Sequence, residues 1–128
     1  MINKNITLTE TEKDDLNAFF EFQLDKEANY LAAFTSKDPS DKPAYIEKYS
    51  KHLSDQTINM RTIKINDVIA GSVARFVREN DAEITYWIDR KFWGQGIAIT
   101  AHKDFLKIEQ TRPVYARVAL AIMVHKEF

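Results

Sequence analysis

The sequence predicts a mixed α/β fold in one domain, with helices first and then a mostly antiparallel sheet that includes one parallel strand pair. The N-terminal part shows helical spacing of apolar residues, and residues 57–89 contain three strand-like segments separated by short turns. A strand, a helix and a strand then occupy residues 83 to about 120, an order that favours a parallel pair. A chain of 128 residues suits one core, so residues 1–128 are treated as a single domain.

Residues 1–55 are predicted to be mostly helical. Thr11-Glu12-Lys13-Asp14 resembles a capping box in which Asp replaces the usual Glu or Gln. The apolar residues that follow at helical spacing are Leu16, Phe19, Phe20 and Leu24. A second helix is expected with Ser40 or Asp41 as its N-cap and Pro43 in its first turn. The apolar face of this second helix would comprise Tyr45, Ile46, Tyr49 and Leu53.

Three strands are predicted at residues 57–65, 68–78 and 83–89, and the Asn-Asp pairs between them indicate turns. Short turns between consecutive strands favour an antiparallel meander. The alternation of side chains between the two faces of the sheet is clearest in the third strand. Its apolar positions are Ile84, Tyr86 and Ile88, and the opposite face carries Glu83, Thr85 and Trp87.

A glycine-containing turn joins this third strand to the next helix. Gly94 and Gly96 are two of only three glycines in the chain. Such a turn lets backbone N–H groups approach a ligand, and the helix that follows adds unpaired N–H donors and a positive dipole end. Phosphate or pyrophosphate is therefore the expected ligand. The P-loop pattern is absent, and Ile99 stands where a dinucleotide fingerprint needs a small residue.

The helix after the turn is expected to place Ile97, Ala101, Phe105 and Ile108 on one stripe, and a strand follows from Val114 to about Leu120. Residues 83–106 resemble the acetyl-CoA-binding segment of the GNAT N-acetyltransferase family, and look most like the subgroup that acetylates ribosomal protein N-termini. Family members carry Gln or Arg, two residues, Gly, one residue, then Gly or Ala. Lys91-Phe92-Trp93-Gly94-Gln95-Gly96 follows that spacing, with Lys in the first position. The order of elements also agrees from residue 6 to about residue 119.

The resemblance implies an acetyl-CoA cosubstrate, no metal, and an amine acceptor that is either a protein α-amino group or a small polyamine-like molecule. Backbone N–H groups from Gln95 to Ala98 would hold the pyrophosphate, and the strand end would pair with the pantetheine arm. Glu83 is the residue that the resemblance assigns as the base that removes a proton from the amine. The residues that the resemblance assigns to coenzyme binding are Trp87, Ile88, Asp89, Lys91, Gly94, Gln95, Gly96, Ile97 and Ala98.

Relatives continue past the last predicted strand with a helix beside the coenzyme and a further strand pair. The sequence ends at Phe128, so we expect a C-terminally truncated member in which that helix and those strands are missing. The conformation of residues 119–128 is left open: they could extend the last strand or begin a helix. A homodimer that covers the open sheet edge is expected. The alternatives are a non-catalytic domain that only binds coenzyme A or forms a structural dimer, and a nucleotide-binding module of another class.

Composition excludes several other classes of function. A formal net charge of −1 disfavours electrostatic binding of nucleic acid by the protein as a whole. The absence of cysteine excludes thiolate metal sites and cysteine nucleophiles. No apolar run approaches the roughly 20 residues that span a bilayer, so we expect a cytoplasmic protein. His52, His102 and His125 do not lie at metal-ligand spacing.

Overall fold

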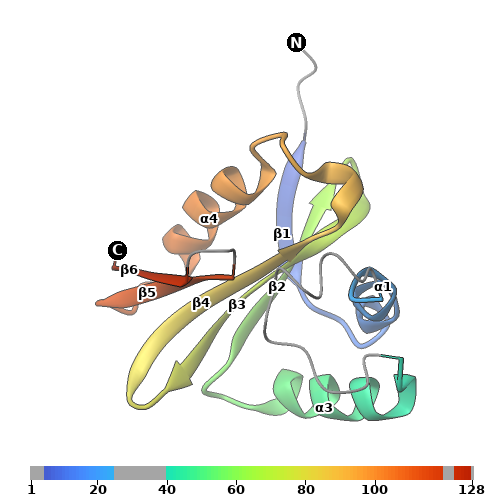
Figure 1. Cartoon of the computed structure of the whole chain (residues 1–128), viewed down its shortest axis with the longest axis horizontal. Helices are drawn as coiled ribbons and strands as arrows, with labels where there is room; N and C mark the ends of the chain where they lie inside the picture. The colour runs from blue at the N-terminus through green and yellow to red at the C-terminus, as the bar shows by residue number, and fades with distance from the viewer. Residues whose placement is uncertain (1–4, 25–39, 120–122, 128) are drawn as a thin grey trace.

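The computed structural model describes residues 5–24, 40–119 and 123–127, and within these ranges it forms one six-stranded sheet with helices on both faces (Figure 1). The strands, in their order across the sheet, are β1 (Ile6–Glu10), β2 (Asn59–Ile65), β3 (Val68–Arg78), β4 (Asp81–Ile88), β5 (Val114–Ala119) and β6 (Met123–Glu127). The helices are α1 (Asp15–Phe22), α3 (Lys42–Ser54) and α4 (Ile97–Ile108), with a short 3-10 helix η1 (Arg90–Phe92).

The predicted mixed sheet is confirmed. The β1–β2, β2–β3, β3–β4 and β5–β6 pairs are antiparallel, and β4 pairs with β5 in parallel. The parallel pair is reached through α4, as the strand, helix and strand order predicts. Beyond β5 the chain forms β6, a separate strand that returns antiparallel from Met123 to Glu127, so neither predicted alternative, an extension of the last strand or a helix, is correct for these residues.

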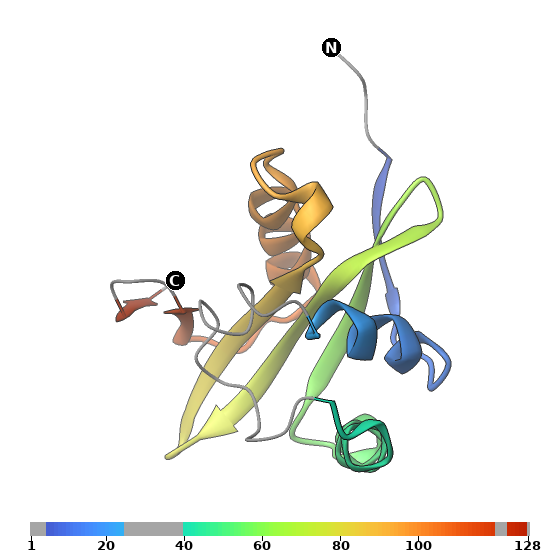
Figure 2. The same ribbon diagram turned by 45° about the vertical axis from the view of Figure 1, so that its right-hand side comes forward.

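The core lies between the sheet and α4. Figure 2 shows α4 on one side of the sheet and α1 and α3 on the other. The predicted stripe of α4 is confirmed for Ile97, Ala101 and Phe105, which are buried. It is wrong for Ile108, which is 45% exposed because the helix ends there. The buried cluster comprises Ile63, Ile65, Ala70, Val73, Ala82, Ile84, Ile97, Ala101, Phe105 and Val114.

The helical prediction for residues 1–55 is wrong at its start, because Ile6–Glu10 is a strand. Ile6 and Leu8 alternate with Thr7 and Thr9, and they pack against the core while β1 pairs with β2. Five alternating residues give a weak signal in the sequence, and tertiary pairing decides their conformation. The part of the prediction on residues 25–39 lies outside the described residues.

The two N-terminal helices begin in different ways. The predicted capping box is wrong: Asp14 is the N-cap of α1, and its side chain makes no capping hydrogen bond. Instead the Asp15 carboxylate accepts hydrogen bonds from the Glu12 N–H at 3.0 Å and the Thr62 hydroxyl at 2.8 Å. These bonds tie the start of α1 to β2. For α3 the predicted cap is confirmed, because the Asp41 side chain accepts from the backbone N–H of Ala44 at 3.1 Å.

A row of aromatic rings attaches α3 to the rest of the fold. Tyr45 packs edge-on against Phe20 of α1, Tyr49 packs against Tyr45, and His52 packs edge-on against Phe76 of β3. The ring centroids of these pairs lie 4.4–5.5 Å apart. Burial raises the pKa of Tyr49, so its hydroxyl stays protonated. No residue of α3 is fully buried, and these partly buried rings pack the helix against α1 and β3.

One buried carboxylate joins the C-terminal end of α4 to the sheet. Glu109 is 5% exposed, and its Oε1 accepts hydrogen bonds from Arg75 at 2.9 Å and Asn59 at 3.1 Å. Its Oε2 accepts from the Thr111 N–H at 3.1 Å. Burial alone would raise the pKa of Glu109, but the hydrogen bonds from Thr111, Arg75 and Asn59 outweigh it and lower the pKa to about 2.

This carboxylate makes stability depend on acid pH. Because the pKa of Glu109 is lower in the folded chain than its ordinary value of 4.5, its contribution is present above pH 5 and is lost as the pH falls towards 2. We expect Glu109→Gln to lower the free energy of unfolding by about 2–3 kcal/mol at pH 7 and to flatten the loss of stability below pH 5.

Urea unfolding at pH 7 and pH 3 measures both effects. The control is Glu47→Gln on α3, whose partner Lys51 is 75% exposed, and which should change stability by less than about 0.5 kcal/mol. Equal losses for the two variants would contradict the assignment.

Candidate functional site

The sheet opens into a fork between β4 and β5. Strand β4 pairs with β3 along its whole length, from Asp81 to Ile88. It pairs with β5 at three positions only, Ala82 to Ile84. Beyond Ile84 no described strand covers this edge of β4, and in Figure 1 the two strands diverge. We call this opening the β4–β5 fork, bounded by residues 85–88 of β4 and the facing part of β5.

The backbone groups that line the fork follow from strand alternation. The Asp89 N–H donates to the Ala70 carbonyl at 2.7 Å, and a Cβ added to Gly71 would collide with the Trp87 carbonyl oxygen. Residues 87 and 89 therefore direct their backbone groups towards β3. Tyr86 and Ile88 direct theirs into the fork, because successive residues of a strand face opposite edges. The carbonyl of Ile88 already accepts a hydrogen bond from the Trp93 indole Nε1 at 2.8 Å.

The fork leads directly to the glycine turn. Gly94 and Gly96 have φ values of 74° and 73°, in the left-handed region that favours glycine. A Cβ on either glycine would meet nothing within 4 Å, so the space in front of the turn is open. Gly96 is the N-cap of α4 and supplies no side chain to cap it. The N–H groups of Ile97 and Ala98 therefore lie in an uncapped first turn, which is a geometry that binds anions.

The polar side chains of the turn hold it in shape. Lys91 is 66% exposed, and its Nζ lies 3.7 Å from Asp89 Oδ2 and 5.3 Å from the centre of the Phe92 ring. The Gln95 side chain donates to the Lys91 carbonyl at 3.2 Å. Lys91 thus sits at the rim of the turn, where a long exposed side chain can reach a bound phosphate.

Glu83 lies near the closed end of the fork. It is 6% exposed and pairs across the sheet with Phe76 of β3 and Tyr115 of β5. Because Phe76 contacts His52 of α3, Glu83 faces the side of the sheet that carries α1 and α3. Six residues of strand, about 20 Å, separate Glu83 from Asp89 at the glycine turn. The structure therefore places the predicted base and the predicted anion site at opposite ends of one open strand edge.

Two structural features beside the fork escaped the sequence reasoning. Tyr86 was predicted to be an apolar strand position, but it is 39% exposed and lies beside the fork, with its ring edge-on to His102 of α4. The ring centroids are 5.8 Å apart. The second feature is the Trp93 hydrogen bond to the Ile88 carbonyl. The sequence carries no signal for either, because both depend on where β4 and β5 separate.

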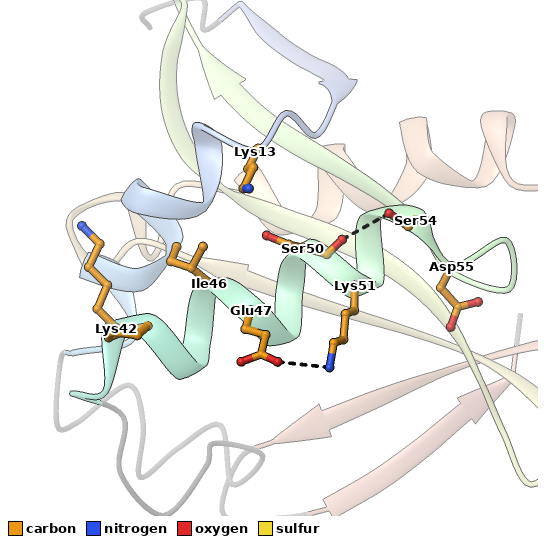
Figure 3. A pocket seen from close by; sticks show the side chains of 9 residues that line it. Lys13, Lys42, Ile46, Glu47, Ser50, Lys51, Ser54 and Asp55 are labelled. Atoms are coloured by element: carbon orange, nitrogen blue, oxygen red, sulfur yellow. Dashed lines mark hydrogen bonds and ion pairs between the residues drawn. The ribbon is translucent and has the colours of Figure 1, made fainter.

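A surface groove lies away from the glycine turn. It is an open groove of about 800 Å³ between the start of α1 and the side of α3 (Figure 3). Its charged lining is mixed, with Lys13, Lys42 and Lys51 against Glu47 and Asp55, and none of the predicted site residues lines it. Within the described ranges, no group of three or more metal-ligating side chains gathers. None of the described helices is long and apolar enough to cross a membrane.

Comparison with known proteins places this geometry in a family. A family model described as an acetyltransferase (GNAT) domain matches residues 5–125. No curated protein sequence matches the chain.

Several solved structures share the fold. The chain is similar to the spermidine N-acetyltransferase of Vibrio cholerae in complex with CoA and spermine, with 20% identity, a TM-score of 0.74, and coverage of 88% of this chain and 70% of that chain. It is similar to an acetyltransferase of Thermus thermophilus, with 13% identity, a TM-score of 0.72, and coverage of 89% and 76%. A ribosomal L7/L12 alpha-N-protein acetyltransferase in complex with coenzyme A gives 15% identity, a TM-score of 0.67, and coverage of 91% and 72%.

The matched residues 5–125 include the described helices, the glycine turn and β1 to β5, and the family agrees with the one that the residues around Gly94 and Gly96 resemble. With a family model that matches nearly its whole length, the chain belongs to the GNAT acetyltransferase domain family.

Proposed function

We propose that this protein is an acetyl-CoA-dependent N-acetyltransferase that transfers an acetyl group to an amine. The observation that carries the proposal is the β4–β5 fork, whose open backbone edge runs from a buried carboxylate to an uncapped helix N-terminus. Coenzyme A has the matching chemistry: a pyrophosphate at one end, an amide-containing arm, and a thioester at the other end.

The residues assigned by resemblance fit this arrangement. The N–H groups from Gln95 to Ala98 are proposed to bind the pyrophosphate, which needs the left-handed glycines of the turn. The arm is proposed to pair with the open edge of β4. Within the Trp87–Asp89 segment, Ile88 is the residue whose backbone faces the fork. Lys91 at the rim would support a phosphate.

The chemical step needs a base and an oxyanion donor. Glu83 is proposed to accept the proton of the attacking amine, directly or through one water molecule. The carbonyl oxygen becomes negatively charged as the amine adds, and backbone N–H groups of the same strand can stabilise it. The Tyr86 N–H is the first such group that faces the fork beyond Ile84. Acetyl-CoA is consumed as a cosubstrate, and no metal is required.

The acceptor is proposed to be a protein α-amino group or a small polyamine-like molecule. Similar structures include enzymes named for both classes of amine, spermidine and a ribosomal protein α-amino group. Assignment to the ribosomal-protein subgroup, a homodimeric state and a cytoplasmic location remain predictions. A panel of peptide and polyamine acceptors and a sedimentation experiment test the first two.

Binding is tested first at the glycine turn. The wild-type chain should bind acetyl-CoA with saturable micromolar affinity in calorimetric titration, and ATP should bind more weakly. Gly96→Ala should weaken acetyl-CoA binding about tenfold, because a left-handed alanine costs about 1–2 kcal/mol and its Cβ enters the open space at the turn.

Asn80→Ala is the matched control for backbone strain. Asn80 also has a positive φ, 70°, but it lies in the β3–β4 turn at the other end of β4. It should lower stability by a similar amount and leave acetyl-CoA affinity unchanged. Equal affinity for ATP and acetyl-CoA would favour a nucleotide-binding module instead.

Catalysis is tested at Glu83. We expect Glu83→Gln to lower kcat for amine acetylation about 10²- to 10³-fold while the Kd for acetyl-CoA changes less than about threefold, because the base acts on the amine and not on the coenzyme. Steady-state kinetics and calorimetry measure the two quantities, with Glu47→Gln as the exposed control. A wild-type chain that binds acetyl-CoA and acetylates no amine would favour the non-catalytic alternative.

A further inference from the structure

A side chain already uses the backbone acceptor at the open end of the fork. The Trp93 indole Nε1 donates a hydrogen bond to the Ile88 carbonyl at 2.8 Å. Tyr86 and Ile88 are the residues of the 85–88 stretch whose backbone groups face the fork. The indole therefore holds one of the two carbonyls that an extended ligand would meet along this edge. Trp93 is not among the residues that the resemblance assigns to coenzyme binding.

Trp93 lies outside the buried core. The neighbouring Phe92 packs against the core cluster, whereas Trp93 is 40% exposed and does not belong to that cluster. Its backbone N–H donates to the Arg90 carbonyl at 3.0 Å, and the Arg90 guanidinium lies 5.8 Å from the centre of its ring. The indole can therefore turn away from the Ile88 carbonyl without opening the core.

An extended arm in the fork would need the same acceptor. A chain that pairs with a strand edge lies about 4.8 Å from it and places N–H groups about 2.9 Å from the carbonyls that face it. The indole nitrogen lies within that distance of the Ile88 oxygen, and it brings a two-ring side chain to the edge. An arm amide and the indole are thus two donors for one carbonyl at the narrow approach to the fork.

We propose that the Trp93 indole closes the open end of the fork in the free chain, and that the arm of coenzyme A displaces it from the Ile88 carbonyl. The inference rests on the proposed binding of acetyl-CoA. One neutral hydrogen bond replaces another, so this acceptor contributes little to the net affinity. In the free chain the indole covers part of the unpaired edge of β4, and a covered edge does not pair with other chains.

The closed fork lowers the apparent affinity for acetyl-CoA. A ligand that binds only the open form has its affinity reduced by the fraction of chains that are open. A neutral hydrogen bond shifts such an equilibrium about three- to tenfold, so about a quarter to a tenth of the free chains would have the fork open.

The direct test follows the indole N–H itself. The chain has two tryptophans, so its proton–nitrogen correlation spectrum contains two indole signals, and Trp93→Phe identifies the signal of Trp93 by its loss. Coenzyme A is then added to the full wild-type chain. We expect the Trp93 indole proton to move upfield and to exchange faster with solvent, because it loses its carbonyl partner.

Affinity gives a second readout. Trp93→Phe keeps an aromatic ring beside Arg90 and removes the competing donor, so it should bind acetyl-CoA about three- to tenfold more tightly than the wild type. ADP carries a pyrophosphate and lacks the arm, so its Kd should be the same for both chains. Calorimetric titration measures both ligands.

Tyr49→Phe is the matched control for loss of a donor from an aromatic ring. Tyr49 lies on α3 and packs against Tyr45 and His52, away from the fork. This variant should leave the Kd values for acetyl-CoA and ADP unchanged.

Each outcome decides. An indole signal that keeps its position and its protection when coenzyme A binds overturns the displacement, and so does weaker binding of acetyl-CoA by Trp93→Phe. An equal gain for ADP and acetyl-CoA also overturns it, because the effect would then lie at the glycine turn and not along the arm. Tighter acetyl-CoA binding by Trp93→Phe, in a chain that acetylates no amine, overturns the proposed transfer and leaves the role of Trp93 in place. Absence of acetyl-CoA binding in both chains overturns both proposals.

Discussion

The site depends on how far β4 pairs with each of its neighbours. On one side β4 pairs with β3 from Asp81 to Ile88, and on the other it pairs with β5 over only Ala82–Ile84. The unpaired stretch leaves backbone donors and acceptors exposed inside an otherwise complete sheet. Unpaired strand edges of this kind can hydrogen-bond an extended chain that offers amide groups, in the way that a sheet edge pairs with another strand. The glycine turn makes the two ends of this edge chemically different, because it places the start of a helix, a geometry that binds anions, at the open end.

Packing on both faces keeps the fork open at a defined place. On one face the buried side of α4 covers the core through Ile97, Ala101 and Phe105, and this packing sets the position of the helix N-terminus. At the other end of α4, Glu109 binds Arg75 and Asn59, so the helix is anchored to β2 and β3 beyond its last turn. The glycine turn thus lies between a strand that is paired along its whole length with β3 and a helix that is anchored at its far end.

The opposite face of the sheet, towards which Glu83 is directed, carries α1 and α3. α1 is joined to β2 through the buried Asp15 carboxylate and the Thr62 hydroxyl, and α3 is joined to both α1 and β3 by its row of rings. These contacts make the face towards α1 and α3 chemically different from the face towards α4, because aromatic and polar groups take the place of the aliphatic core. In the proposed transfer, the fork that would hold acetyl-CoA lies between these two dissimilar faces.

The sequence by itself determined the strand meander, the helix after the glycine turn, the parallel pair and the family. Local sequence patterns predict most of these features. Alternation of apolar residues predicts β2 to β4, helical spacing of apolar residues predicts α4, and the spacing of Gly94 and Gly96 predicts the turn. The sequence missed β1, misplaced the carboxylate that ties down α1, and treated Tyr86 as an ordinary apolar position. All three depend on partners distant in the chain, since β1 forms only against β2 and Asp15 acts only beside Thr62. Tyr86 gains its exposure only where β5 diverges from β4, and that divergence is a property of the folded sheet.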